Sequence, residues 1–184
     1  MVSLETPVCD FGKKAPNFEL PGVDGRSWSL QQCMGEKGLL IMFICNHCPY
    51  VKAIIDRLCR DVTEIQAMGI GVAAIMSNDT HAYPEDSYAN MQIMAKRLNF
   101  SFPYLYDPTQ NIARQYGAAC TPDFLGFNRD LELQYRGRLD SNEISPSTPD
   151  AHRELVEAMR LIVNTGKGPD EQVASSGCSI KWRN

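Results

Sequence analysis

The chain of 184 residues lacks the charge pattern of a protein that binds nucleic acid. Its formal net charge is -4, and its lysines and arginines form no cluster. Sequence-independent binding to a phosphate backbone needs a positively charged surface over a wide area. We therefore expect no nucleic acid among the partners of this protein.

Long apolar runs are also missing. No run approaches the ~20 consecutive apolar residues that a membrane-spanning helix needs. The first residues, Met1 to Glu5, do not form a basic region followed by a long apolar stretch, which is the pattern of a secretory signal. The sequence predicts no membrane contact and a cytoplasmic location.

The cysteines do not have the pattern of a disulfide framework. There are seven, an odd number, and they are widely scattered. A chain of this length buries a sizeable core without disulfides, so we expect most thiols to be free and any disulfide to be transient and catalytic. Cys9, Cys33 and Cys59 are expected to be structural, and the sequence leaves the role of Cys178 open.

Hydrophobic patterning predicts strands that alternate with helices. The predicted strands cover residues 39–44, 72–76, 102–106, 124–127 and 131–139, the predicted helices cover 49–68, 85–98, 110–116 and 151–163, and residues 15–30 form a hairpin. Such β-α-β units followed by an antiparallel pair give a mixed central sheet with helices on both faces. We expect one α/β domain over 1–184, with a hairpin extension over 1–38 and a tail over 165–184.

The motif that carries chemistry lies where the first central strand meets a helix. The apolar run from Leu39 to Ile44 ends at Cys45, and Cys48 follows with C-x-x-C spacing, directly before Pro49. Proline suits the first helical position. Backbone N–H groups and the positive end of the helix dipole stabilise an anion at this place. The arrangement predicts thiolate chemistry at the helix start.

Several short segments, spread over nearly the whole chain, resemble one protein family. They are APNFELP at 15–21, NHCPYV at 46–51, CTPDF at 120–124, YRGRLD at 135–140 and GCSIKW at 177–182. The chain resembles the peroxiredoxin-like redoxins of the thioredoxin superfamily, close to the alkyl hydroperoxide reductase / thiol-specific antioxidant proteins. The resemblance implies a thioredoxin-like fold, thiol redox chemistry and no cofactor.

The resemblance also implies which cysteine attacks. Cys48 lies five residues after Phe43, as the attacking cysteine of thioredoxins does after the Phe that closes its strand, and Val51 stands where glutaredoxins have a second cysteine. Cys48 is therefore the expected nucleophile. Cys45 and Cys120 are the two candidates for the cysteine that resolves it.

Four further residues are expected to support this site. His47 either lowers the pKa of Cys48 when it is protonated or points away from it. Pro49 starts the helix. Thr121 and Pro122 match the position at which thioredoxins place a cis-proline against the active cysteine, and an X-Pro bond is compatible with the cis form.

A peroxide reductase with antioxidant activity is the main alternative. Peroxiredoxins carry a Thr or Ser three residues before the attacking cysteine, a Pro seven before it, and a distant Arg. In this chain, Cys45 stands at the position of the Thr or Ser, and Ile41 stands at the position of the Pro. The segment that would contain the Arg corresponds to Thr121-Pro122, and it has a proline instead. We therefore expect thiol–disulfide exchange, with protein or small-molecule disulfides, or less efficiently peroxides, as substrates and a thiol as electron donor.

Two other functions and the assembly stay open at this point. Cys45, Cys48 and either His47 or His81 offer soft ligands for a copper or zinc module, although one cysteine pair is short of a closed zinc site. A binding or chaperone domain that kept the fold and lost the chemistry is the non-catalytic alternative. A homodimer is one assembly that the sequence allows.

Overall fold

The computed structural model describes residues 3–6 and 10–183, and its centre is a five-stranded mixed sheet with the order β6-β5-β4-β8-β9. These strands are β4 (Gly38–Phe43), β5 (Ile70–Met76), β6 (Tyr104–Tyr106), β8 (Asp123–Asn128) and β9 (Leu133–Gly137). The first three are parallel, and β8 and β9 are antiparallel to their neighbours. The predicted β-α-β units and late hairpin are thus confirmed.

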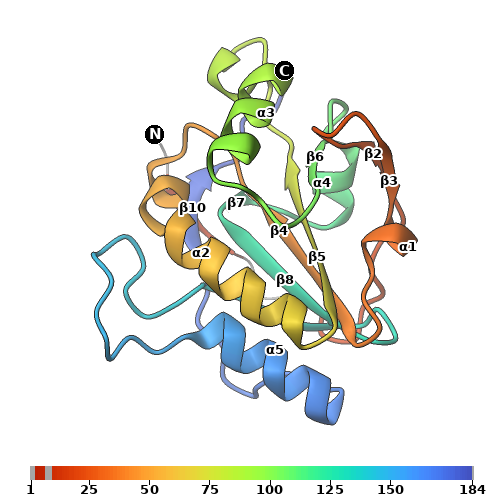
Figure 1. Ribbon diagram of the computed structural model, residues 1–184, viewed down its shortest axis with the longest axis vertical. Helices are drawn as coiled ribbons and strands as arrows, with labels where there is room; N and C mark the ends of the chain where they lie inside the picture. The colour runs from red at the N-terminus through yellow and green to blue at the C-terminus, as the bar shows by residue number, and fades with distance from the viewer. Residues whose placement is uncertain (1–2, 7–9, 184) are drawn as a thin grey trace.

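The sheet has a core on each face because the central strands are apolar on both sides. Alternate residues of β4 point to opposite faces: Leu40 and Met42 pack in one core, Leu39 and Ile41 in the other. Figure 1 shows helices α2 (Pro49–Ala67) and α5 (Glu154–Thr165) lying across one face. On the other face lie α1 (Leu30–Cys33), α4 (Asn111–Gln115) and the hairpin of β2 (Glu19–Pro21) and β3 (Ser27–Ser29).

One predicted helix is divided in the structure. Residues 85–98 were expected to be continuous, but a 3-10 turn η1 (Pro84–Asp86) precedes helix α3 (Tyr88–Arg97). Ser87, between them, has an extended backbone with ψ of 154°. This break turns the buried Asp86 toward residues 46 and 47, so the irregular backbone serves a tertiary contact.

A second, three-stranded sheet was not predicted. Its order is β1-β10-β7, made by β1 (Ser3–Glu5), β10 (Ser176–Ser179) and β7 (Cys120–Thr121), all antiparallel. The tail from residue 165 is rich in Gly, Ser and Pro, and no strand is predicted in it from the sequence. Pairing between distant segments overrides that local composition. The end of the chain thereby returns to the peptide bond between Thr121 and Pro122, which is cis.

Two further expectations concern Cys9 and membrane-spanning helices. Cys9 lies outside the described residues. None of the helices in the described part of the chain has both the length and the apolar character to cross a bilayer.

Candidate active site

Cys48 lies at the junction between β4 and α2. It is the N-cap residue of α2, and Pro49 takes the first helical position. The backbone N–H of Val51 lowers the pKa of Cys48, because the first N–H groups of a helix have no partner within it. The cysteine is fully buried. The structure thus places a thiol at the helix start, as the sequence predicts.

Three groups besides that N–H surround the sulfur of Cys48. Its Sγ atom lies 2.9 Å from the Sγ of Cys178 and 3.1 Å from the carbonyl oxygen of Thr121, and the Cys45 thiol hydrogen-bonds it. The hydrogen bond from Cys45 lowers the pKa of Cys48 to about 5; burial opposes the shift, and the Cys178 thiol and the Val51 N–H add to it. These surroundings favour the thiolate form of Cys48.

Cys45 has the opposite electrostatic role. Its pKa is raised, first by the hydrogen bond that it donates to Cys48, then by burial and by the negative charge of Asp86. Its sulfur also lies 3.4 Å from the Thr121 hydroxyl oxygen. Cys45 thus keeps its proton and stabilises the neighbouring thiolate, so the two cysteines of the motif are chemically distinct.

Asp86 holds the turn between these cysteines, a role that the sequence did not reveal. One carboxylate oxygen accepts the backbone N–H groups of Asn46 and His47 at 2.7 and 3.2 Å. The other lies 2.6 Å from Nδ1 of His47 and accepts from Asn78 at 2.7 Å. Asp86 is fully buried. Asp86 lies within the segment 85–98 that the sequence predicts as a helix, and it carries no signal there, because only the tertiary fold brings residue 86 to the motif.

The ring of His47 is held on two sides. Its ring is bonded to Asp86 and stacks on Tyr83, with ring centroids 5.4 Å apart and an interplanar angle of 6°. His47 therefore supports the turn through Asp86. The effect of His47 on the pKa of Cys48 stays a prediction.

Replacing Asp86 with Ala is expected to destabilise the protein by about 2–4 kcal/mol, because buried N–H groups lose their acceptor. The turn also loses its anchor, so the pKa of Cys48 should rise toward that of a free thiol. Chemical unfolding and a pH titration of the thiol absorbance measure the two effects. Glu85→Ala is the matched control, since the Glu85 side chain is exposed; equal losses in both variants would contradict this role of Asp86.

The segment from Cys120 to Pro122 lies against the site, as expected from the resemblance. Thr121 contributes its carbonyl to Cys48 and its hydroxyl to Cys45. The Cys120 thiol instead donates to the carbonyl of Pro122 at 3.5 Å, and burial raises its pKa. Its resolving role, like that of Cys45, stays a prediction.

A cation is one alternative for part of this site. Cys45, His47 and Asp86 offer ligand atoms within 4.8 Å of one another, whereas the exposed His81 is not among them. However, both Asp86 oxygens accept N–H groups, which accounts for the buried carboxylate without an ion. The metal-binding alternative stays a prediction.

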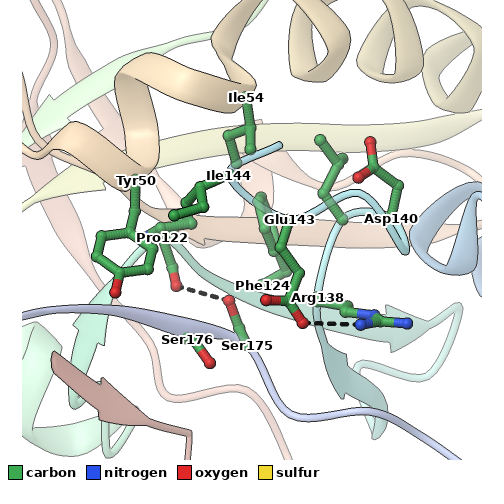
Figure 2. A pocket seen from close by; sticks show the side chains of 11 residues that line it. Tyr50, Ile54, Pro122, Phe124, Arg138, Asp140, Glu143, Ile144, Ser175 and Ser176 are labelled. Atoms are coloured by element: carbon green, nitrogen blue, oxygen red, sulfur yellow. Dashed lines mark hydrogen bonds and ion pairs between the residues drawn. The ribbon is translucent and has the colours of Figure 1, made fainter. Parts of the chain in front are cut away.

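A shallow apolar pocket adjoins the site (Figure 2). Tyr50, from the first turn of α2, and Pro122 form one side, and Ile54, Phe124 and Ile144 continue it. Charged groups stand at its far edge, where Arg138 and Glu143 pair at 2.8 Å. The pocket offers an apolar surface beside the buried sulfur.

Comparisons with known proteins agree with this geometry. A model of the AhpC/TSA family matches residues 11–139. The comparison with curated proteins returns no match.

Among solved structures, an uncharacterized conserved protein from Geobacillus kaustophilus is 42% identical to this chain, with a TM-score of 0.93. The match covers 100% of this chain and 97% of the Geobacillus chain. A hypothetical protein from Sinorhizobium meliloti 1021 is 33% identical, with a TM-score of 0.91, covering 97% and 98%. The thioredoxin domain of a thiol-disulfide oxidoreductase from Bacteroides vulgatus is 11% identical, with a TM-score of 0.59, covering 70% and 89%. This last likeness shows that the fold is thioredoxin-like.

Proposed function

Because the chain belongs to the AhpC/TSA family and has a thioredoxin-like fold, we propose that it is a thiol-dependent oxidoreductase in which Cys48 is the nucleophile of thiol–disulfide exchange. One observation carries the proposal: the sulfur of Cys48 stands at the N-terminus of α2, 2.9 Å from the sulfur of Cys178, in surroundings that lower its pKa, with Cys45 as the largest cause. Such a site stabilises a thiolate, which is the attacking form of cysteine.

The first step is attack of the Cys48 thiolate on one sulfur of a disulfide. A bond forms between Cys48 and that sulfur, and the other sulfur leaves as a thiolate. The apolar pocket beside Tyr50 and Pro122 suits an apolar group next to the substrate's disulfide. The substrates are protein or small-molecule disulfides, and a thiol donor of a reducing cytoplasm returns the enzyme to its starting state.

The surroundings of Cys48 favour disulfides over peroxides. In the described part of the chain, the contacts of its sulfur come from Cys45, Val51, Thr121 and Cys178. A guanidinium group that would polarise a peroxide is not among these contacts. Arg136, on strand β9, forms an ion pair with Asp123 of strand β8 at 2.7 Å.

Stopped-flow mixing of the reduced protein with hydroxyethyl disulfide or hydrogen peroxide tests the proposal. A free thiol is only a few per cent ionised at pH 7, so complete ionisation of Cys48 raises either rate by about 30-fold at most. We expect the rate constant for hydrogen peroxide to stay within about 30-fold of that of free cysteine. Hydroxyethyl disulfide should react with the protein and be reduced catalytically when a thiol donor is present.

Two outcomes would contradict this assignment. A peroxide rate orders of magnitude above that of free cysteine would make the protein a peroxidase. A reduced protein that reacts with neither reagent would favour the non-catalytic binding domain.

A further inference from the structure

Strand β10 delivers a third cysteine to the site. Cys178 pairs with Thr121 in the register of β10 and β7, and its sulfur lies 2.9 Å from that of Cys48. A disulfide bond is about 2.05 Å long. The two sulfurs, 130 residues apart in the chain, are thus in contact and need only a short approach to form a bond.

Gly177 permits this close approach of the two strands. A Cβ atom at this position would lie 2.2 Å from the carbonyl oxygen of Thr121, which no real side chain tolerates. A glycine directly before Cys178 therefore allows β10 to lie against the segment that ends in Pro122. The GCSIKW motif thus has a structural reason for its first residue.

The chain is anchored on both sides of Cys178. On the N-terminal side, the Ser175 hydroxyl donates to the carbonyl of Pro122 at 2.9 Å. On the C-terminal side, the Lys181 N–H donates to Asn78 at 2.9 Å, and Gln110 donates to the Lys181 carbonyl at 2.8 Å. Cys178 is therefore presented by a fixed strand, and it need not be recruited from a distant position.

The two cysteines favoured by the sequence are less well suited to resolve Cys48. Cys45 donates the hydrogen bond that contributes most to the thiolate, and a bond to Cys45 would remove that donor. Cys120 directs its thiol to the carbonyl of Pro122. The sulfur of Cys178 lies 2.9 Å from that of Cys48.

We propose that Cys178 is the resolving cysteine of this enzyme, an inference that rests on the proposed role of Cys48. After Cys48 has formed a mixed disulfide with a substrate sulfur, the Cys178 thiol loses its proton and attacks the Cys48 sulfur. The bond between Cys48 and Cys178 forms, and the substrate sulfur leaves as a thiolate that takes up a proton. Two protein thiols are oxidised, one substrate disulfide is reduced to two thiols, and a thiol donor then reduces the protein.

The order of these steps follows from the electrostatics of the pair. Burial raises the pKa of Cys178, and the hydrogen bond to Cys48 and its negative charge raise it further. When Cys48 becomes part of a mixed disulfide, it loses its negative charge. Neither that charge nor the hydrogen bond to a Cys48 thiolate then raises the pKa of Cys178. Cys178 therefore ionises more readily once there is a mixed disulfide to attack.

The test is a single turnover with hydroxyethyl disulfide, followed by mass spectrometry of the intact and digested protein. The reduced wild type should release about two equivalents of mercaptoethanol and contain a Cys48–Cys178 disulfide. Cys178→Ser should release about one and keep one mercaptoethanol on Cys48. Cys59→Ser, a change in α2 away from these sulfurs, should behave as the wild type.

The outcomes separate this inference from the proposed function. A mixed disulfide that resolves in Cys178→Ser as fast as in the wild type, or a wild-type disulfide that joins Cys48 to Cys45 or Cys120, would overturn the inference and leave the nucleophile in place. A wild type whose Cys48 never forms a mixed disulfide would overturn both. Mapping the disulfide in the wild type needs no variant. It therefore tests the role of Cys178 even if Cys178→Ser folds poorly.

Discussion

Replacing Cys48 with Ser is expected to lower the turnover of a disulfide substrate by about a thousandfold or more, because a hydroxyl cannot replace a thiolate as nucleophile. The change removes one sulfur from a fully buried site and keeps the shape of the side chain. Turnover with hydroxyethyl disulfide and a thiol donor measures the effect. Cys59→Ser is the control, and it should retain wild-type turnover.

The same variant has a spectroscopic signature that does not depend on a substrate. Thiolates absorb near 240 nm, and the lowered pKa of Cys48, about 5, predicts an absorbance step between pH 4 and 6 in the wild type. A group with a lowered pKa is ionised above that value, so the step should rise with pH. Cys48→Ser should lack it. A variant that keeps both turnover and the step would refute the assignment of the nucleophile.

Replacing Arg136 with Ala is expected to have the largest effect on stability. Arg136 and Asp123 form a bidentate pair at 2.7 and 3.2 Å between β9 and β8, and both side chains are almost fully buried. Removing the guanidinium leaves a buried carboxylate without its cation, which costs about 3–5 kcal/mol. The free energy of unfolding in urea measures the loss.

The loss at Arg136 should depend on pH. Burial already raises the pKa of Asp123, and its arginine opposes that shift, so the pKa rises further in Arg136→Ala. An acid whose pKa is higher in the folded state than in the unfolded state favours folding when it is protonated. The variant should therefore be less impaired at pH 5 than at pH 8.

A neighbouring arginine provides the control for this measurement. Arg138 pairs with Glu143 and Glu154 but is more exposed, so Arg138→Ala should cost only about 1 kcal/mol. A loss that is equal in the two variants, or one that does not change between pH 5 and pH 8, would contradict the account of the buried pair.

Local patterns were sufficient for the central sheet and for the position of the Cys48 thiol at the start of α2. The apolar run of β4 is buried on both sides, and the helical spacing that follows Pro49 continues to Ala67 in α2. These features depend on neighbours in sequence, so periodicity and a cysteine before a helix were enough to predict them. The thioredoxin-like fold that the resemblance implied is confirmed.

Local patterns were insufficient where distant segments meet. Residues 85–98 show helical periodicity, yet the backbone breaks at Ser87 and brings Asp86 to the turn between the two cysteines. The tail has weak strand propensity, yet it pairs with β1 and β7. Both outcomes come from hydrogen bonds between residues far apart in the chain, and short-range propensity does not encode these bonds.

The sequence by itself determined that a thiol stands where a strand ends and a helix begins, because the apolar run, the cysteine and the proline are contiguous. Only the tertiary structure decided which groups surround that thiol. Cys45 came to favour its thiolate through a turn held by Asp86, and strand pairing across 130 residues brought the Cys178 sulfur to within 2.9 Å of it. The physical reason is that proximity in this site is created by buried hydrogen bonds and strand register, which exist only once the chain has folded.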